Sequence, residues 1–174
     1  MSRLPTASWL LIFVCASLAP ALPAAAQAPS LAVLAGAFNV GDDRIAHTAD
    51  MELGVEVRFV EADLGFLRER LRPIAGAAAT SGEGYWGFVG LRYENRLRER
   101  WTLGLSIAVA LYERGEGKNL GGAVEFRSGI EAAYQVRERL RVGVMLYHLS
   151  NAGIYRPNPG TESLVLTVST PLGR

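Results

Sequence analysis

The chain has 174 residues, with 18 basic and 17 acidic side chains, so its formal net charge is only +1 at pH 7. This balance provides no electrostatic basis for binding nucleic acid. The one cysteine, Cys15, lies in an apolar N-terminal stretch. Because the rest of the chain has no cysteine, the sequence excludes a disulfide framework, a thiolate metal site and cysteine catalysis there.

The first 26 residues have the three parts of a secretory leader. Arg3 supplies a positive charge, an apolar run extends from Trp9 to Leu18, and Ala26 ends a small-residue cleavage site. We therefore predict a signal peptide over residues 1–26 and a single exported domain over residues 27–174. Removal of the leader takes away Arg3 and leaves 17 basic against 17 acidic residues.

Beyond the leader, hydrophobic residues recur with a period of two, which is typical of β-strands that have one apolar face. Between residues 51 and 60, Leu53, Val55 and Val57 alternate with residues such as Glu52 and Glu56. Similar alternation runs through residues 101–111 and 123–134. These segments have about the ten residues that a strand needs to cross a membrane in a tilted barrel.

We predict eight strands, near residues 31–39, 49–60, 70–79, 84–95, 99–112, 121–135, 139–150 and 162–172. The third is the weakest, because Pro73 and the alanine run 77–79 give little alternation. The even number of strands, the leader and the aromatic residues near strand ends favour an all-β, eight-stranded antiparallel transmembrane β-barrel of the outer membrane. A soluble sandwich or lipocalin-like barrel shows the same alternation with its apolar face inside, so the pattern alone leaves that alternative open.

In a membrane barrel, the charged face of each strand lines a narrow lumen. The predicted lumenal set is Glu52, Glu56, Arg58, Arg92, Glu94, Glu125, Arg127 and Glu131. An eight-stranded barrel has room for little besides side chains, so we expect these charges to neutralise one another and form no ion path. No His, Asp or Glu cluster has metal-ligand spacing and no glycine-rich phosphate loop follows a strand, so we expect no metal and no other cofactor.

Residues 148–162 combine the groups of a serine hydrolase, with His148 as base, Ser150 as nucleophile and Glu162 as orienting acid. Residues i and i+2 of a strand share a face, so His148 and Ser150 emerge side by side. Both continue the apolar parity of Leu146, and Glu162 shares the parity of Leu164. The site is therefore expected on the outer wall, at the outer-leaflet level if both termini are periplasmic, where it meets a membrane lipid.

The same residues also suit an ordinary strand end beside a turn-rich loop, which is the non-catalytic alternative. Asn151 is a candidate oxyanion donor, assisted by backbone amides near Gly153, but it is equally a turn former. The other histidine, His47, is expected to be a solvated loop residue.

The pattern His148-x-Ser150-Asn151-x-Gly153, continued by Pro157-Asn158-x-Gly160-x-Glu162 and a final strand, resembles the lipid A 3-O-deacylase (PagL) family. The leader, the length and the eight-strand pattern are also similar to that family. The resemblance implies an outer-membrane serine esterase that needs no cofactor and releases the 3-O-linked acyl chain of lipid A as a 3-hydroxy fatty acid. It implies catalytic roles for Ser150, His148 and Glu162, and supporting or oxyanion roles for Asn151, Gly153 and Asn158.

Two other functions remain as alternatives. One is a non-enzymatic structural or adhesive barrel, although most of its predicted loops are short and leave little binding surface. The other is a soluble lipocalin-like carrier, which would not need detergent. The partners expected for the esterase are lipopolysaccharide and outer-membrane lipids, without nucleic acid, and the sequence does not decide whether the chain forms a homodimer.

Overall fold

The computed structural model describes residues 28–41, 49–63 and 70–173. The predicted leader and His47 lie outside the described residues, so the signal peptide and the loop position of His47 stay predictions. Within the described part, no helix has the length and apolar character needed to span a membrane.

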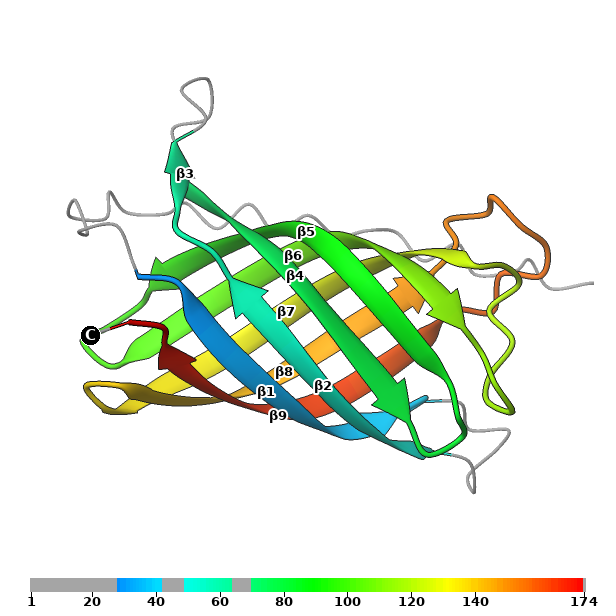
Figure 1. Cartoon of the computed structure of the whole chain (residues 1–174), viewed down its shortest axis with the longest axis horizontal. Helices are drawn as coiled ribbons and strands as arrows, with labels where there is room; N and C mark the ends of the chain where they lie inside the picture. The colour runs from blue at the N-terminus through cyan, green and yellow to red at the C-terminus, as the bar shows by residue number, and fades with distance from the viewer. Residues whose placement is uncertain (1–27, 42–48, 64–69, 174) are drawn as a thin grey trace, which may run out of the picture.

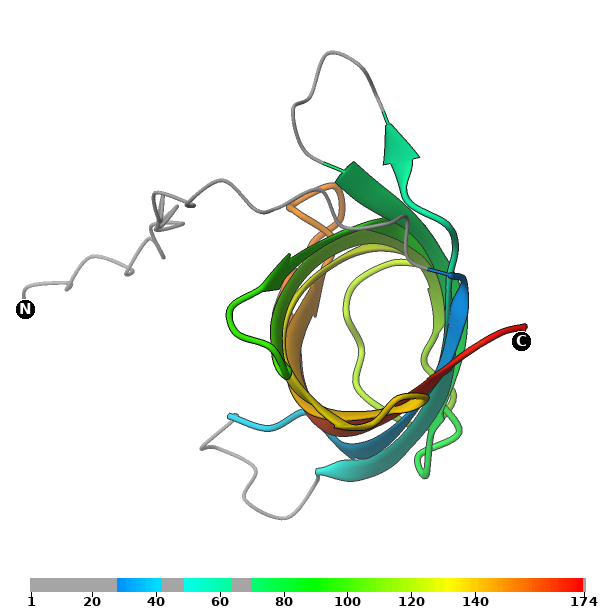
Figure 2. The same ribbon diagram turned by 90° about the vertical axis from the view of Figure 1, so that its left-hand side faces the viewer.

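The described strands form one closed antiparallel barrel (Figures 1 and 2). The strands are β1 (Ser30–Phe38), β2 (Asp50–Arg58), β3 (Ala62–Asp63), β4 (Arg70–Thr80), β5 (Tyr85–Arg96), β6 (Trp101–Glu113), β7 (Val124–Arg137), β8 (Leu140–Ser150) and β9 (Thr161–Pro171). Neighbours follow the order β2-β1-β9-β8-β7-β6-β5-β4, and pairing between β2 and β4 closes the ring. The predicted eight-stranded antiparallel barrel is confirmed, including its weakest strand, which is β4. The two-residue β3, which pairs with the start of β4, was not expected.

The barrel wall is apolar on its outer side. In β6, Leu105, Ile107 and Leu111 are exposed, whereas the residues between them are small and mostly buried, including Ala108 and Ala110. Alternation along each strand produces this division, because successive side chains point to opposite faces. The inside-polar, outside-apolar arrangement is that of a membrane barrel and the reverse of a soluble lipocalin-like barrel.

Ion pairs fill one part of the lumen. Glu131 binds both Arg58, at 3.1 Å, and Arg92, and Arg127 lies 3.2 Å from Glu56. Each of these side chains is at most 1% exposed. These pairs confirm the expected neutralisation.

Neutralisation does not extend to Glu125. This residue is buried, but neither of its carboxylate oxygens has a hydrogen-bond partner among the described residues. Glu52 is instead bound by the Tyr147 hydroxyl, which donates a hydrogen bond to its carboxylate. The alternation in the sequence therefore placed both carboxylates in the lumen but did not identify their partners.

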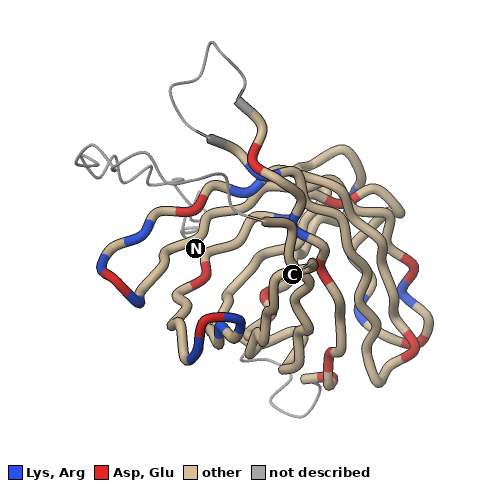
Figure 3. Tube along the Cα trace, turned by 60° about the vertical axis from the view of Figure 1, so that its left-hand side comes forward, with Lys and Arg blue, Asp and Glu red and all other residues tan. Residues whose placement is uncertain are grey.

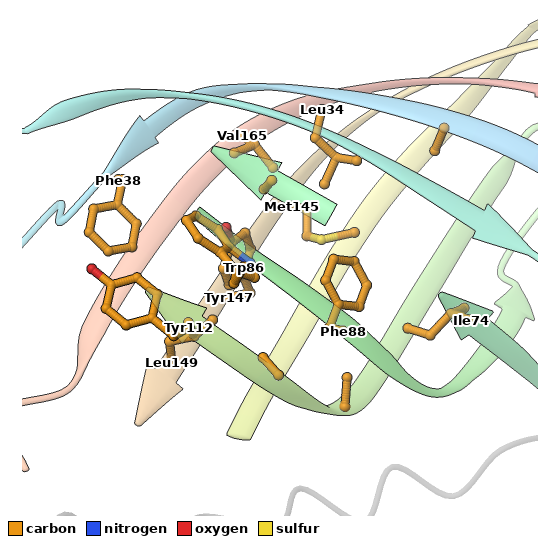
Figure 4. Packing of buried hydrophobic residues seen from close by; sticks show 14 of the residues in the cluster. Leu34, Phe38, Ile74, Trp86, Phe88, Tyr112, Met145, Tyr147, Leu149 and Val165 are labelled. Carbon is orange, nitrogen blue, oxygen red and sulfur yellow. The ribbon is translucent and has the colours of Figure 1, made fainter. Parts of the chain in front are cut away.

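Aromatic side chains fill the part of the lumen nearer the β8–β9 loop (Figure 4). The Phe38 and Trp86 rings lie 5.4 Å apart between centroids, and Trp86 lies 6.0 Å from Tyr112. Tyr112 also donates a hydrogen bond to the backbone carbonyl of Lys118, at 2.8 Å. The segment 114–123 is thereby attached to the aromatic core.

The two ends of the barrel differ. Ser30 pairs with Pro171 at one end, and Arg139 in the turn between β7 and β8 donates a hydrogen bond to the Pro171 carbonyl there, at 3.2 Å. Charged turns gather at this end, near the C-terminus (Figure 3). The longer connections 114–123 and 151–160 lie at the opposite end (Figure 1). The β8–β9 loop therefore lies at the end of the barrel opposite the C-terminus.

Candidate active site

A histidine and a glutamate form a pair on the outer wall. His148 lies directly opposite Glu162 in the β8–β9 ladder, and its Nδ1 is 3.1 Å from Glu162 Oε1. The two side chains are 43% and 48% exposed, on the same outer side as Leu146 and Leu164. The parity argument therefore placed these two residues correctly, and the strand register brings them into contact.

The imidazole ring of His148 lies close to the backbone of Gly160. The register that joins Leu149 to Thr161 places Gly160 opposite Ser150 at the next step. A methyl group at Gly160 would lie 2.7 Å from His148 Cε1 and 3.2 Å from Nε2. Glu162 therefore contacts the ring at Nδ1, and Cε1 and Nε2 lie on the side of Gly160.

Ser150 ends strand β8 two residues after His148, so the two side chains share the outer face. Its hydroxyl makes no hydrogen bond to the residues that the structure describes, His148 included. In unliganded hydrolases the bond between nucleophile and base often tightens only when substrate binds, so this geometry is compatible with catalysis.

Asn151 holds the loop that follows Ser150. It is fully buried, and its amide group donates to the carbonyls of Leu120, at 2.8 Å, and Pro157, at 3.2 Å. Its Oδ1 accepts the backbone N–H of Gly153 at 2.9 Å. Asn158 completes the arrangement, because its Oδ1 accepts the Asn151 N–H at 3.1 Å. The expected support residues thus meet within the loop, and the amide hydrogens of Asn151 are engaged there.

Sequence analysis included Gly160 in the motif but assigned it no role in the site. It is buried with φ +63°, a conformation that glycine adopts without steric cost. A role for Gly160 could have been predicted from the hairpin. If His148 pairs with Glu162, the same register continued by two residues puts Gly160 opposite Ser150.

Two other kinds of site were considered for the described residues. A cavity of about 210 Å³ lies at the terminal end, lined by residues that include Arg72, Arg96 and Arg141, and it is remote from His148. The described part of the chain contains no group of three His, Cys, Asp or Glu side chains arranged to hold a metal ion. Among the described residues, the β8–β9 hairpin is therefore the candidate site, because it carries the His148–Glu162 pair.

A family model described as lipid A 3-O-deacylase (PagL) matches residues 52–171, which include the whole hairpin. The chain belongs to this family. Lipid A deacylase PagL of Pseudomonas aeruginosa PAO1 is 35% identical to it over 69 residues, which are 40% of this chain and 40% of that protein. The alignment thus spans well under half the length of this relative.

Solved structures show the same fold. The crystal structure of the outer membrane enzyme PagL aligns with a TM-score of 0.63 at 22% identity, over 82% of this chain and 99% of that chain. The Neisserial surface protein A (NspA) aligns with a TM-score of 0.55 at 11% identity, over 86% of this chain and 100% of that one. These matches show the barrel fold, and the family match together with the apolar outer wall identifies an outer-membrane β-barrel.

Proposed function

We propose that this family member is an outer-membrane esterase that hydrolyses the 3-O-linked acyl chain of lipid A. The observation that carries the proposal is the His148–Glu162 pair, at 3.1 Å, on the apolar outer wall beside Ser150. A base and a nucleophile on this face meet membrane lipids directly and are separated from the lumen by the wall. All three residues come from one hairpin, so a single chain supplies the proposed triad.

In the proposed reaction, His148 Nε2 accepts the Ser150 proton while Oγ attacks the ester carbonyl carbon. The tetrahedral intermediate then collapses, and the sugar oxygen leaves with the proton that His148 returns to it. A water molecule, deprotonated by His148, attacks the acyl-serine, and His148 returns the proton to Ser150 Oγ as the 3-hydroxy fatty acid leaves. Glu162 accepts the Nδ1–H throughout, which keeps the imidazole in the required tautomer and stabilises its charged form.

We assign Asn151, Gly153 and Asn158 to support of the oxyanion environment. Their mutual hydrogen bonds fix the backbone directly after Ser150, where a developing negative charge would lie. The loop lies at the end of the barrel opposite the Ser30–Pro171 pair. With both termini in the periplasm, this end reaches the outer leaflet, where lipid A is found.

The proposal is tested with detergent-refolded protein, purified lipid A and mass spectrometry. The wild-type protein is expected to remove one hydroxyacyl chain from lipid A and release the corresponding 3-hydroxy fatty acid. Ser150→Ala is expected to fold and to release none, because it lacks the attacking oxygen. If a folded wild-type barrel leaves lipid A intact, the esterase proposal fails and the structural or adhesive barrel is favoured.

Gly160→Ala is expected to lower kcat about 100-fold while the barrel still folds. The added methyl group would lie 2.7 Å from His148 Cε1, so the ring must move, and displacement of a catalytic group by about 1 Å costs on that order. KM should change little, because substrate contacts are kept. The measurement is steady-state kinetics on lipid A in detergent micelles.

Gly173→Ala is the matched control, because Gly173 has φ +99° and nothing within 4 Å of an added methyl group. It adds the same methyl group to another glycine with positive φ, without a contact to the site. Unfolding provides a second readout: Gly160→Ala should destabilise the barrel less in a His148→Ala background, where the clash is absent. Equal destabilisation in both backgrounds would show that Gly160 does not position His148.

A further inference from the structure

A polar side chain interrupts the apolar outer face of β7 next to the candidate site. Ser128 is exposed and lies directly opposite His148, on the side of β8 away from Glu162. Its outward neighbours along β7, Phe126 and Ile130, are 38% and 46% exposed and apolar. We consider outward-facing residues of the described strands that are more than one position from a strand end. These residues are apolar or aromatic, with two exceptions, His148 and Ser128.

The Ser128 hydroxyl makes no hydrogen bond to the residues that the structure describes. A hydroxyl that faces hydrocarbon without a partner is unfavourable, since no water is present there to replace the missing bond. Ser128 is therefore placed to receive a partner from a bound lipid. The imidazole beside it already has Glu162 on its other flank, at Nδ1.

The arrangement of strands indicates which part of a lipid passes Ser128. Ser150 pairs with Phe126, two residues along the ladder from the Ser128–His148 pair. Diagonal neighbours of this kind have Cα atoms about 7–8 Å apart. An acyl chain leaving Ser150 toward the middle of the barrel meets the carboxylate Glu162 on the β9 side. On the β7 side it meets Phe126, Ser128 and Ile130 in turn, which is the apolar route.

We propose that Ser128 hydrogen-bonds a hydroxyl group on the acyl chain close to the scissile carbonyl, and so makes the site select hydroxylated acyl esters. The inference rests on the proposed function, since it requires the ester carbonyl at Ser150. A hydroxyl within two or three carbons of that carbonyl lies at the level of Ser128. The rest of the acyl chain contacts the apolar outward residues nearer the middle of the barrel. An unhydroxylated chain leaves the serine without its partner.

The test compares two lipid A preparations that differ only in the presence of a hydroxyl on the 3-O-linked acyl chain. Wild-type protein should hydrolyse the hydroxylated ester about 5- to 10-fold faster in kcat/KM, the size expected of one hydrogen bond. Ser128→Ala should lower kcat/KM for the hydroxylated ester to the value for the other ester, which it leaves unchanged. Ser128→Thr retains a hydroxyl and should keep the preference.

Two outcomes would overturn the inference. One is an unchanged ratio between the esters in Ser128→Ala; the other is an equal loss for both esters, which would mean that Ser128 acts on the reaction itself or on the fold. Heat-modified electrophoretic mobility reports folding of each variant independently. Failure of the proposed function looks different, because wild-type protein would then hydrolyse neither ester.

Discussion

His148→Ala is expected to abolish deacylation, with a loss on the order of 10⁴- to 10⁶-fold in kcat. The reason is that no other described base contacts the outer face beside Ser150, and an unassisted hydroxyl is a poor nucleophile. Glu162→Ala should cost less, on the order of 10²- to 10⁴-fold, because it only orients the imidazole and stabilises its charge. The graded pair of losses distinguishes a triad from a set of unrelated polar residues.

Folding should be unaffected in both variants. His148 and Glu162 are 43% and 48% exposed, and substitutions of such side chains usually change stability by about 0.5 kcal/mol or less. Asn95→Ala is a suitable control, since Asn95 is a polar outward residue near the terminal end of β5. Kinetics on lipid A and the heat-modified mobility shift are measured together. Deacylation by His148→Ala at the wild-type rate would contradict the proposed triad.

Glu131→Ala is expected to destabilise the barrel by about 3–5 kcal/mol, the range found when one member of a buried ion pair is removed. Glu131 binds Arg58 and Arg92 and accepts a hydrogen bond from Thr167. Its removal leaves the buried guanidinium groups of Arg58 and Arg92 with only Glu56 and Glu94, among the described residues, to offset the cost of burying their charge. Urea titration of the refolded protein in detergent, followed by the mobility shift, measures the change.

Glu138→Ala provides the comparison for this variant, because Glu138 is exposed in the turn between β7 and β8. Its removal is expected to change the unfolding midpoint little. Glu131→Ala should also leave the kinetics of the molecules that do fold nearly unchanged, because Glu131 points into the lumen and His148 points outward. A midpoint equal to that of wild type would show that the lumenal ion pairs contribute no net stability.

Period-two alternation accounts for the success of the sequence-based prediction of the fold. A strand places alternate residues on opposite faces whatever its neighbouring strands are. The shared face of His148, Ser150 and Leu146 could therefore be predicted before any strand pairing was known. The same rule put Glu56, Arg58 and Glu131 inside the barrel. It also allowed the proposed triad to be placed on the outer wall.

The register between neighbouring strands and the contacts between loops could not be predicted from this alternation. The contact of His148 with Glu162 depends on the β8–β9 register, and the attachment of Asn151 to the Leu120 carbonyl depends on how two loops meet. The lack of a hydrogen-bond partner for Glu125 among the described residues depends on which side chains meet across the lumen, and β3 depends on its pairing with the start of β4. No local pattern encodes these features, because each joins residues through backbone hydrogen bonds or packing across strands.

The sequence by itself determined the eight strands of the barrel wall and their inner and outer faces, and it nominated His148, Ser150 and Glu162 as the candidate triad, since these inferences depend on local periodicity and residue type. The tertiary structure decided which partners those residues have. It set the imidazole between Glu162 and Gly160, and it placed Ser128 beside His148. The physical reason is that strand register, fixed by closure of the whole barrel, determines which side chains lie next to one another.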